Sequence, residues 1–118
     1  MSAKKNLIIY QGSTFKFVFK LSRSVNKIDT PVDLSGAIAK MQIRPSHRSD
    51  TLYLDLYEEG YISISDPMNG EITINIPPGM TADLEFSKAV YDIQVEFSDG
   101  HIMRVIEGYI TLSPEVTR

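Results

Sequence analysis

A period of two in the apolar side chains constrains this sequence more than any other feature. The stretch TFKFVFKL places Phe15, Phe17, Phe19 and Leu21 on one face and Thr14, Lys16, Val18 and Lys20 on the other. This is the alternation of a half-buried β-strand. The same alternation recurs in TLYLDLY, with Leu52, Leu54 and Leu56 inside, and in EITINI, with Ile72, Ile74 and Ile76 inside. No window of about a dozen residues carries a helical stripe, so the sequence predicts an all-β fold.

Shorter apolar runs and turn signals complete this prediction. YISIS, AIAKMQIR and, with less regular spacing, NLIIY are further candidate strands. The dipeptides Asn69-Gly70 and Asp99-Gly100 each separate two candidate strands, and both tolerate the positive φ angles of a tight hairpin turn. Prolines 31, 45, 77 and 78 fall between the apolar runs, where a missing N–H costs no ladder hydrogen bond. We therefore expect an immunoglobulin-like antiparallel β-sandwich of about seven to nine strands.

The rest of the chain is assigned to loops and ends. SRSVNKIDTP (22–31) and RPSHRSD (44–50) are polar and are predicted to be exposed loops. No linker or repeat divides the sequence, so one domain is expected over residues 1–118. Within it, residues 1–6 are expected to be a flexible N-terminal arm and residues 113–118 a C-terminal tail.

Composition narrows the possible partners. The chain has 118 residues, no cysteine and a formal net charge of -3, with an isoelectric point near 5.3. It therefore lacks disulfides, thiolate metal sites and the basic surface that nucleic acid requires. No stretch approaches the roughly 20 apolar residues of a membrane helix, and the N-terminus has no signal-peptide core. We expect a soluble protein made in the cytoplasm.

Residues that perform chemistry are sparse. His47 lies in a polar loop and His101 follows a turn, without metal-ligand spacing, so both are interpreted as solvated side chains. Asp55, Glu58 and Glu59 are close in sequence, but the alternation places them on a solvent-exposed face or in a turn, which argues against acid–base catalysis. No Gly-x-Ser-x-Gly elbow and no glycine-rich phosphate cradle occurs. The sequence therefore predicts a protein without catalytic, metal-binding or cofactor-binding residues and without a small-molecule substrate.

Aromatic residues suggest contact surfaces instead. Tyr53, Tyr57 and Tyr61 form a candidate row that either contacts a protein or covers a second buried face, and the alternative is a sugar platform. The neighbouring acidic residues Asp55, Glu58 and Glu59 argue against phosphate. Tyr91 opens a strand and is interpreted as a tyrosine corner, whose hydroxyl bonds back to the preceding connection.

The hairpin from Val90 to Leu112 gives the last predictions. Its first strand turns Tyr91, Ile93, Val95 and Phe97 inward, and Ile93 is expected to be buried opposite Phe17. Its second strand is apolar on both faces, and Gly108 is the expected position of a bulge. We expect a loop of the chain or, more strongly, a partner to cover it. The segment that follows supplies candidate partner contacts, namely Glu115, Val116, Thr117 and Arg118.

A family resemblance covers roughly Tyr10 to Arg118. The order DLSGAIAKMQIRP (33–45), NGEITINIPPGMTADL (69–84) and YDIQVEFSDGHIMRVIEGYITLSPEVTR (91–118) resembles small virion proteins of tailed bacteriophages. These combine a DLSG…MQIR strand, a G-x-I-x-[IL]-x-I block, a YDI strand and a PEVTR ending. At the level of fold, the chain also resembles the N-terminal immunoglobulin-like domain of phage baseplate upper proteins.

This resemblance implies a structural component of the tail, baseplate or neck. Such a protein is located in the virion and binds other virion structural proteins, in multiple symmetric copies, through loops and edge strands. The alternative function is a carbohydrate-binding or host-adhesion domain that uses Tyr53, Tyr57 and Tyr61. Both hypotheses predict a binding protein and no enzyme.

Overall fold

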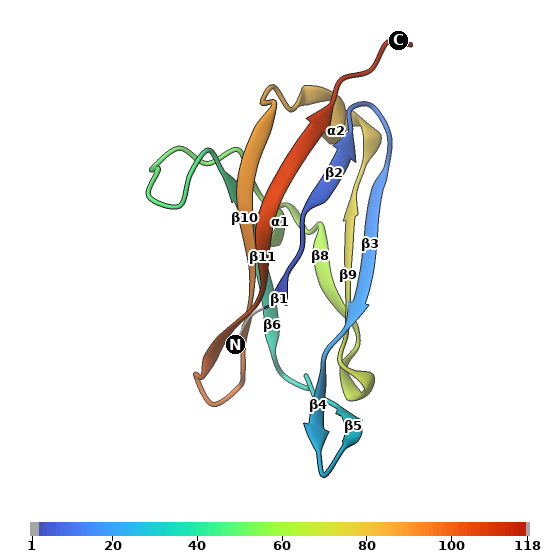
Figure 1. The fold of residues 1–118 in the computed structure, drawn as a ribbon, viewed down its shortest axis with the longest axis vertical. Coiled ribbons are helices and arrows are strands. Elements are labelled where there is room, and N and C mark those ends of the chain that lie inside the picture. Colours follow the sequence, from blue (N-terminus) through green and yellow to red (C-terminus); the bar gives the residue numbers. More distant parts are fainter. Residues whose placement is uncertain (1–2, 118) are drawn as a thin grey trace.

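Two β-sheets face each other in the computed structural model, which describes residues 3–117 (Figure 1). The larger, six-stranded sheet has the order β1-β11-β10-β6-β7, and β2 also pairs with β11. Its strands are β1 (Ala3–Lys4), β2 (Leu7–Tyr10), β6 (Ile38–Arg44), β7 (Leu54–Asp55), β10 (Lys88–Glu96) and β11 (Ile102–Ser113). β1 and β2 run parallel to β11, whereas the other neighbours in this sheet are antiparallel.

The opposing sheet has three antiparallel strands in the order β3-β9-β8. These are β3 (Phe15–Lys20), β8 (Ile62–Asp66) and β9 (Glu71–Ile76). Three short helical turns connect strands, namely α1 (Leu56–Glu59), the 3-10 turn η1 (Pro67–Asn69) and α2 (Pro78–Asp83). No helix within residues 3–117 is long and apolar enough to cross a membrane. The prediction of an immunoglobulin-like β-sandwich is confirmed.

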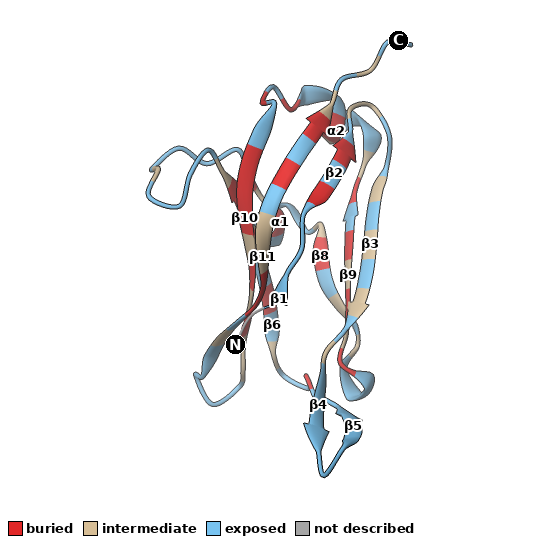
Figure 2. Cartoon of the chain, in the orientation of Figure 1, coloured by how far each residue is buried: buried red, intermediate tan, exposed pale blue. Residues whose placement is uncertain are grey.

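The core lies between the two sheets, on the faces that the period of two identifies (Figure 2). Ile72, Ile74 and Ile76 of β9 are fully buried against Ile93 and Val95 of β10. Phe17 was expected to be buried like Ile93, but all three phenylalanines of β3 are only partly buried. The reason is that β3 is the edge strand of its sheet, so one flank of each ring lacks a neighbouring strand.

The prediction of a long strand in TLYLDLY is wrong. Only Leu54 and Asp55 pair with β6, and α1 begins at the next residue. Asp55 caps this helical turn, because its carboxylate accepts hydrogen bonds from the backbone N–H groups of Tyr57 and Glu58. The extended strand therefore stops at Asp55. Leu54 and Leu56 are buried as expected, whereas Leu52, also expected inside, is exposed.

The segment 22–31, expected to be a loop, forms a two-stranded hairpin of β4 (Ser22–Val25) and β5 (Ile28–Pro31). Asn26 and Lys27 connect the strands with φ angles of 53° and 66°, as a type I′ turn requires. The hairpin projects from one end of the sandwich (Figure 1). Local turn chemistry thus overrides the polar composition that favoured a loop.

The N-terminal segment pairs with β11 where the structure describes it. Ala3 and Lys4 pair with β11, and the N–H of Lys5 donates to the carbonyl of Glu107 at 2.9 Å. Residues expected to belong to a flexible arm are thus placed against β11. Residues 1 and 2 lie outside the described part of the chain.

The hairpin of β10 and β11 confirms the turn at Asp99-Gly100 and corrects two details. The register shifts between Ile93 and Gln94, which pair with Ile106 and Arg104, so the bulge is at Val105 and not at Gly108. It turns both Val105 and Ile106 inward. Because of this shift, Val105 and Ile106, which a regular strand would place on opposite faces, both enter the chain's own core, whereas Ile102 and Tyr109 stay exposed.

Tyr91 is buried as expected but is not a tyrosine corner. Its hydroxyl donates to the carbonyl of Lys5 at 2.6 Å, and not to the connection that precedes β10. Lys5 lies in the connection between β1 and β2. The periodicity of β10 alone does not reveal this hydrogen-bond partner.

Candidate functional site

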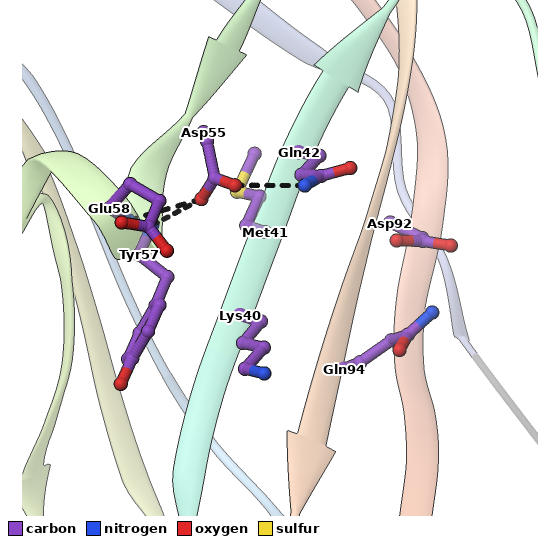
Figure 3. Close-up of a pocket in the computed structure, with 8 residues that line it drawn as sticks. All are labelled: Lys40, Met41, Gln42, Asp55, Tyr57, Glu58, Asp92 and Gln94. Atoms are coloured by element: carbon purple, nitrogen blue, oxygen red, sulfur yellow. Dashed lines mark hydrogen bonds between the residues drawn. The ribbon is translucent and has the colours of Figure 1, made fainter. Parts of the chain in front are cut away.

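A polar groove of about 310 Å³ lies on the outer face of the six-stranded sheet, beside α1 (Figure 3). The register pairs Gln42 of β6 with Asp92 of β10, and Lys40 with Gln94. Alternate residues of a strand share one face, so these four side chains lie together. The groove is lined by Lys40, Met41, Gln42, Asp55, Tyr57, Glu58, Asp92 and Gln94.

Hydrogen bonds within the protein already occupy much of this groove. The side-chain amide of Gln42 donates to Asp55 at 2.8 Å, while its carbonyl accepts from Arg44 at 2.8 Å. The second oxygen of Asp55 is used by the cap of α1. A ligand here would compete with existing bonds, which makes the groove a poor catalytic centre.

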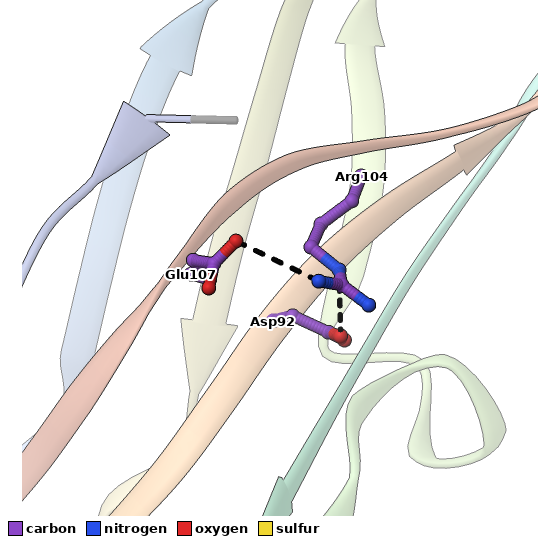
Figure 4. Close-up of polar contacts among 3 residues, drawn as sticks. All are labelled: Asp92, Arg104 and Glu107. Carbon is purple, nitrogen blue, oxygen red and sulfur yellow. Dashed lines mark ion pairs between the residues drawn. The ribbon is translucent and has the colours of Figure 1, made fainter. Parts of the chain in front are cut away.

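Ion pairs border the groove on the side of β11 (Figure 4). The guanidinium of Arg104 lies 3.3 Å from Asp92 and 3.7 Å from Glu107. On the other side, the ammonium of Lys40 lies 3.3 Å from Glu96 and 5.4 Å from the centre of the Tyr57 ring. These charges are therefore paired within the sheet, as on a solvated outer face.

Neither histidine is part of a reactive cluster. The ring of His101 packs against Phe97 with 5.7 Å between ring centres, and His47 lies in the loop after β6. Among residues 3–117, neither imidazole has a hydrogen bond or ion pair with a hydroxyl or a carboxylate. No group of three or more His, Cys, Asp or Glu in the same range is placed to hold a metal ion.

The three candidate tyrosines do not form one platform. Tyr53 stacks on Phe86, with 4.8 Å between ring centres, whereas the ring of Tyr57 faces the ammonium of Lys40. Tyr61 is partly buried and packs against the core. Each ring therefore has its own environment, and the flat shared surface needed for stacking on a sugar is not formed.

The candidate contacts after β11 lie at the opposite end of the molecule from the β4–β5 hairpin (Figure 1). Glu115 donates its N–H to the side chain of Gln11 at 3.2 Å, while Val116 is 93% exposed and Thr117 is exposed. Arg118 lies outside the described residues.

A larger cleft, of about 670 Å³, lies between the β4–β5 hairpin and the turn that joins β10 to β11. Apolar side chains from both hairpins line it, together with charged groups at its margins. The lining residues are Arg23, Val25, Thr30, Pro31, Val32, Asp33, Ser35, Phe97, Ser98, Asp99, His101 and Met103.

Two carboxylates of this cleft are used by their own loops. Asp33 accepts from the hydroxyl of Ser35 at 2.6 Å and from its N–H at 2.9 Å, and these bonds, the hydroxyl bond first, lower the pKa of Asp33. Asp99 accepts from the N–H of His101 at 2.9 Å. The cleft therefore offers a partner apolar side chains, the guanidinium of Arg23 and other polar groups. The apolar residues are Val25, Pro31, Val32, Phe97 and Met103, and the other polar groups belong to Thr30, Ser98 and His101.

Sequence reasoning missed this cleft because it assigned 22–31 to a loop. The signal was Asn26 between the β-branched residues Val25 and Ile28, which is typical of a two-residue hairpin turn. The start of α1 also had a signal, because Asp55 is followed three residues later by Glu58, as in a capping box.

Comparison with known proteins gives a similarity at the level of fold. Neither a protein-family model nor a curated protein matches the sequence. Among solved structures, the chain is similar to CopC from Methylosinus trichosporium OB3b, with 19% sequence identity and a TM-score of 0.49. The alignment covers 99% of this chain and 90% of that one. A similarity this low transfers neither a ligand nor an activity to the chain.

The resemblance to tailed-phage virion proteins is wrong. Neither a family model nor a curated protein supports the phage motifs. The strand pattern that suggested the resemblance is shared by β-sandwiches in general, because it encodes burial and turns. The virion function, including a baseplate, tail or neck position, is therefore withdrawn.

Proposed function

We propose that this chain is a non-catalytic domain that binds another protein through the cleft between its β4–β5 hairpin and the β10–β11 turn. The observation that supports the proposal is the state of the hairpin. Every residue of β4 and β5 is exposed, and the apolar side chains at its tip, Val25 and Ile28, are 50% and 67% exposed.

An isolated two-stranded hairpin is at best marginally stable in water. This one extends beyond the sandwich (Figure 1), and it is tied at its base by the bond from the N–H of Val32 to the carbonyl of Leu21, at 3.0 Å. A partner that covers Val25 and Ile28 removes apolar surface from water and stabilises the hairpin at the same time. The geometry is therefore suited to an element that becomes rigid on binding.

The chemistry of the cleft favours a protein over a small polar ligand. Val25, Phe97 and Met103 contribute apolar surface from the two hairpins, while Asp33 and Asp99 are occupied by their own loops. Protein interfaces use this combination, in which an apolar anchor enters a pocket surrounded by polar groups. Arg23 supplies the charge that orients such a partner.

The test is a comparison of two variants in cells of the source organism. The tagged chain, the variant Val25→Ser/Ile28→Ser and the control Ile8→Ser are each purified after chemical cross-linking and examined by mass spectrometry. Ile8 is a matched control, because it is 52% exposed but lies on β2, away from the hairpin.

We expect a protein that cross-links to residues 22–31 at fixed stoichiometry, is lost with the hairpin variant and is retained with Ile8→Ser. Equal recovery with both variants would overturn the proposal, and so would the absence of any stoichiometric partner. Unchanged circular dichroism of the hairpin variant confirms that the sandwich itself is intact.

A further inference from the structure

β3 is an unprotected edge of the three-stranded sheet. It pairs with β9 over its whole length, from Phe15 opposite Ile76 to Lys20 opposite Glu71, and with no other strand in residues 3–117. It contains neither a proline nor a register shift, whereas the other edge strand, β8, is irregular between Ile64 and Asp66. A regular edge of this kind offers unpaired backbone N–H and C=O groups to another strand.

The inner face of β3 also lacks full cover. Phe15, Phe17 and Phe19 are partly buried, although the facing residues of β9 are fully buried (Figure 2). Phe17 and Phe19 pack on each other with 5.4 Å between ring centres, and the ammonium of Lys5 lies 5.7 Å from the centre of the Phe17 ring. A strand added beside β3 would place apolar side chains next to these rings and complete their burial.

The outer face indicates the charge of such a strand. It presents Lys16, Val18 and Lys20, which are all exposed. The cross-strand neighbours of Lys16 and Val18 are the uncharged Asn75 and Thr73, while Lys20 is opposite Glu71, whose carboxylate accepts from the hydroxyl of Ser65 at 2.8 Å. Side chains directly opposite each other on neighbouring strands interact, and opposite charges stabilise the pair. Acidic residues on the incoming strand therefore match the two lysines.

Pairing with a second copy of this chain is unfavourable at this edge in the two registers that align the lysines. Antiparallel pairing of two β3 strands about Val18 would place Lys16 of one copy opposite Lys20 of the other. Parallel pairing in register would align each lysine with its own equivalent. Like charges that face each other across strands are destabilising, so an acidic strand suits this edge better than a second copy does in these registers.

We propose that β3 binds an extended segment of a partner protein, in which apolar residues alternate with Asp or Glu, as an added strand of the three-stranded sheet. Its apolar side chains extend the cover of Phe15, Phe17 and Phe19, and its carboxylates face Lys16 and Lys20. This surface is separate from the hairpin cleft, so the two proposals succeed or fail independently.

The test uses synthetic peptides and the intact chain. One peptide is Ac-EVEIEVE-NH2, and its counterpart has lysine in place of every glutamate. Binding is measured by calorimetric titration, and the site by amide hydrogen exchange. We expect the acidic peptide to slow exchange in residues 15–20 and the lysine peptide to bind more weakly.

Charge reversal provides the matched control. The variant Lys16→Glu/Lys20→Glu should weaken binding of the acidic peptide by roughly tenfold, because two attractive pairs become repulsive. The variant Lys27→Glu/Lys88→Glu makes the same change in net charge away from β3 and should leave binding unchanged. Equal effects of the two variants would show that only net charge matters and would overturn the proposal.

N-methylation tests whether the peptide pairs as a strand. Only alternate residues of an added strand point their N–H groups at the edge. Two acidic peptides, N-methylated at the odd or at the even residues, should therefore differ, with one losing binding and the other retaining it. Similar behaviour of both peptides would contradict strand addition, and no binding by the unmodified acidic peptide would show that the lysines serve only to protect the edge.

Discussion

The hydroxyl of Tyr91 donates a hydrogen bond to the backbone carbonyl of Lys5 at 2.6 Å and so joins β10 to the connection between β1 and β2. Gly108 of β11 pairs with Tyr91 and lies against the Lys5 carbonyl. A Cβ atom at position 108 would overlap the Lys5 carbonyl, so the glycine permits this approach. The neighbouring N–H of Tyr109 also donates to the side chain of Asn6 at 3.1 Å. The N-terminal segment is thus fixed to the sheet by side-chain bonds as well as by the ladder.

Removal of this hydroxyl should destabilise the protein. We expect Tyr91→Phe to lower the free energy of unfolding by about 1 kcal/mol, because the ring stays buried while the Lys5 carbonyl loses its donor. Urea unfolding followed by circular dichroism measures this change. Tyr109→Phe, which alters an exposed ring, is the control and should have little effect. An unchanged midpoint for Tyr91→Phe would mean that the bond does not contribute.

Tyr91 also predicts a loss of stability at high pH. Burial raises the pKa of Tyr91 from 10.0 to about 12. Below pH 10 the phenol is neutral in both states. As the pH rises toward 12, the unfolded chain loses this proton while the folded chain retains it, so unfolding is favoured. The stability advantage of wild type over Tyr91→Phe should therefore shrink between pH 10 and 12. Denaturant unfolding across this range measures it, and a constant difference would contradict the shift.

Gly108→Ala should destabilise the protein by about 1–3 kcal/mol. The added methyl group meets the carbonyl of Lys5, which is backbone and is held by the Tyr91 bond. Thermal melting measures the loss. Gly79→Ala is the control, since a Cβ at position 79 meets no atom within 4 Å. If both variants melt at the same temperature, the connection between β1 and β2 moves aside more easily than this packing indicates.

Thr81 links α2 to the turn between β2 and β3 and is fully buried. Its hydroxyl accepts from the N–H of Gly12 at 3.1 Å and donates to the carbonyl of Ser13 at 2.8 Å. Thr81→Val keeps the shape but leaves these backbone groups unsatisfied, so we expect a loss of about 1–3 kcal/mol in the free energy of unfolding. Chemical denaturation of this variant and of the exposed control Thr51→Val should differ by that amount. Equal stabilities would show that water replaces the hydroxyl.

The strands of the core were predictable because burial of one face imposes its own period on the sequence. Ile72, Ile74 and Ile76 of β9 show this directly, and the alternating Ile93 and Val95 of β10 do the same. The β4–β5 hairpin and α1 were missed for a different reason. Both are governed by short-range turn and capping chemistry at Asn26 and Asp55, which hydrophobic periodicity does not record.

The candidate contacts were less predictable than the strands. Tyr53, Tyr57 and Tyr61 are close in sequence, but the change from strand to helical turn at Asp55 sends their rings to different neighbours. The cleft between the two hairpins joins residues 23–35 to residues 97–103. No local pattern contains that relationship, because it depends on how the two hairpins leave the sandwich.

The sequence by itself determined that the chain forms a β-sandwich, which strand faces enter the core and where the β10–β11 hairpin turns, since these depend on side-chain period and on local φ preferences. Only the tertiary structure decided the partner of Tyr91, the inward turn of both Val105 and Ile106, and the exposure of the β3 edge. These features arise from contacts between segments far apart in the chain. The energies of these contacts depend on sheet order and register, which the spacing of residues along the sequence does not specify.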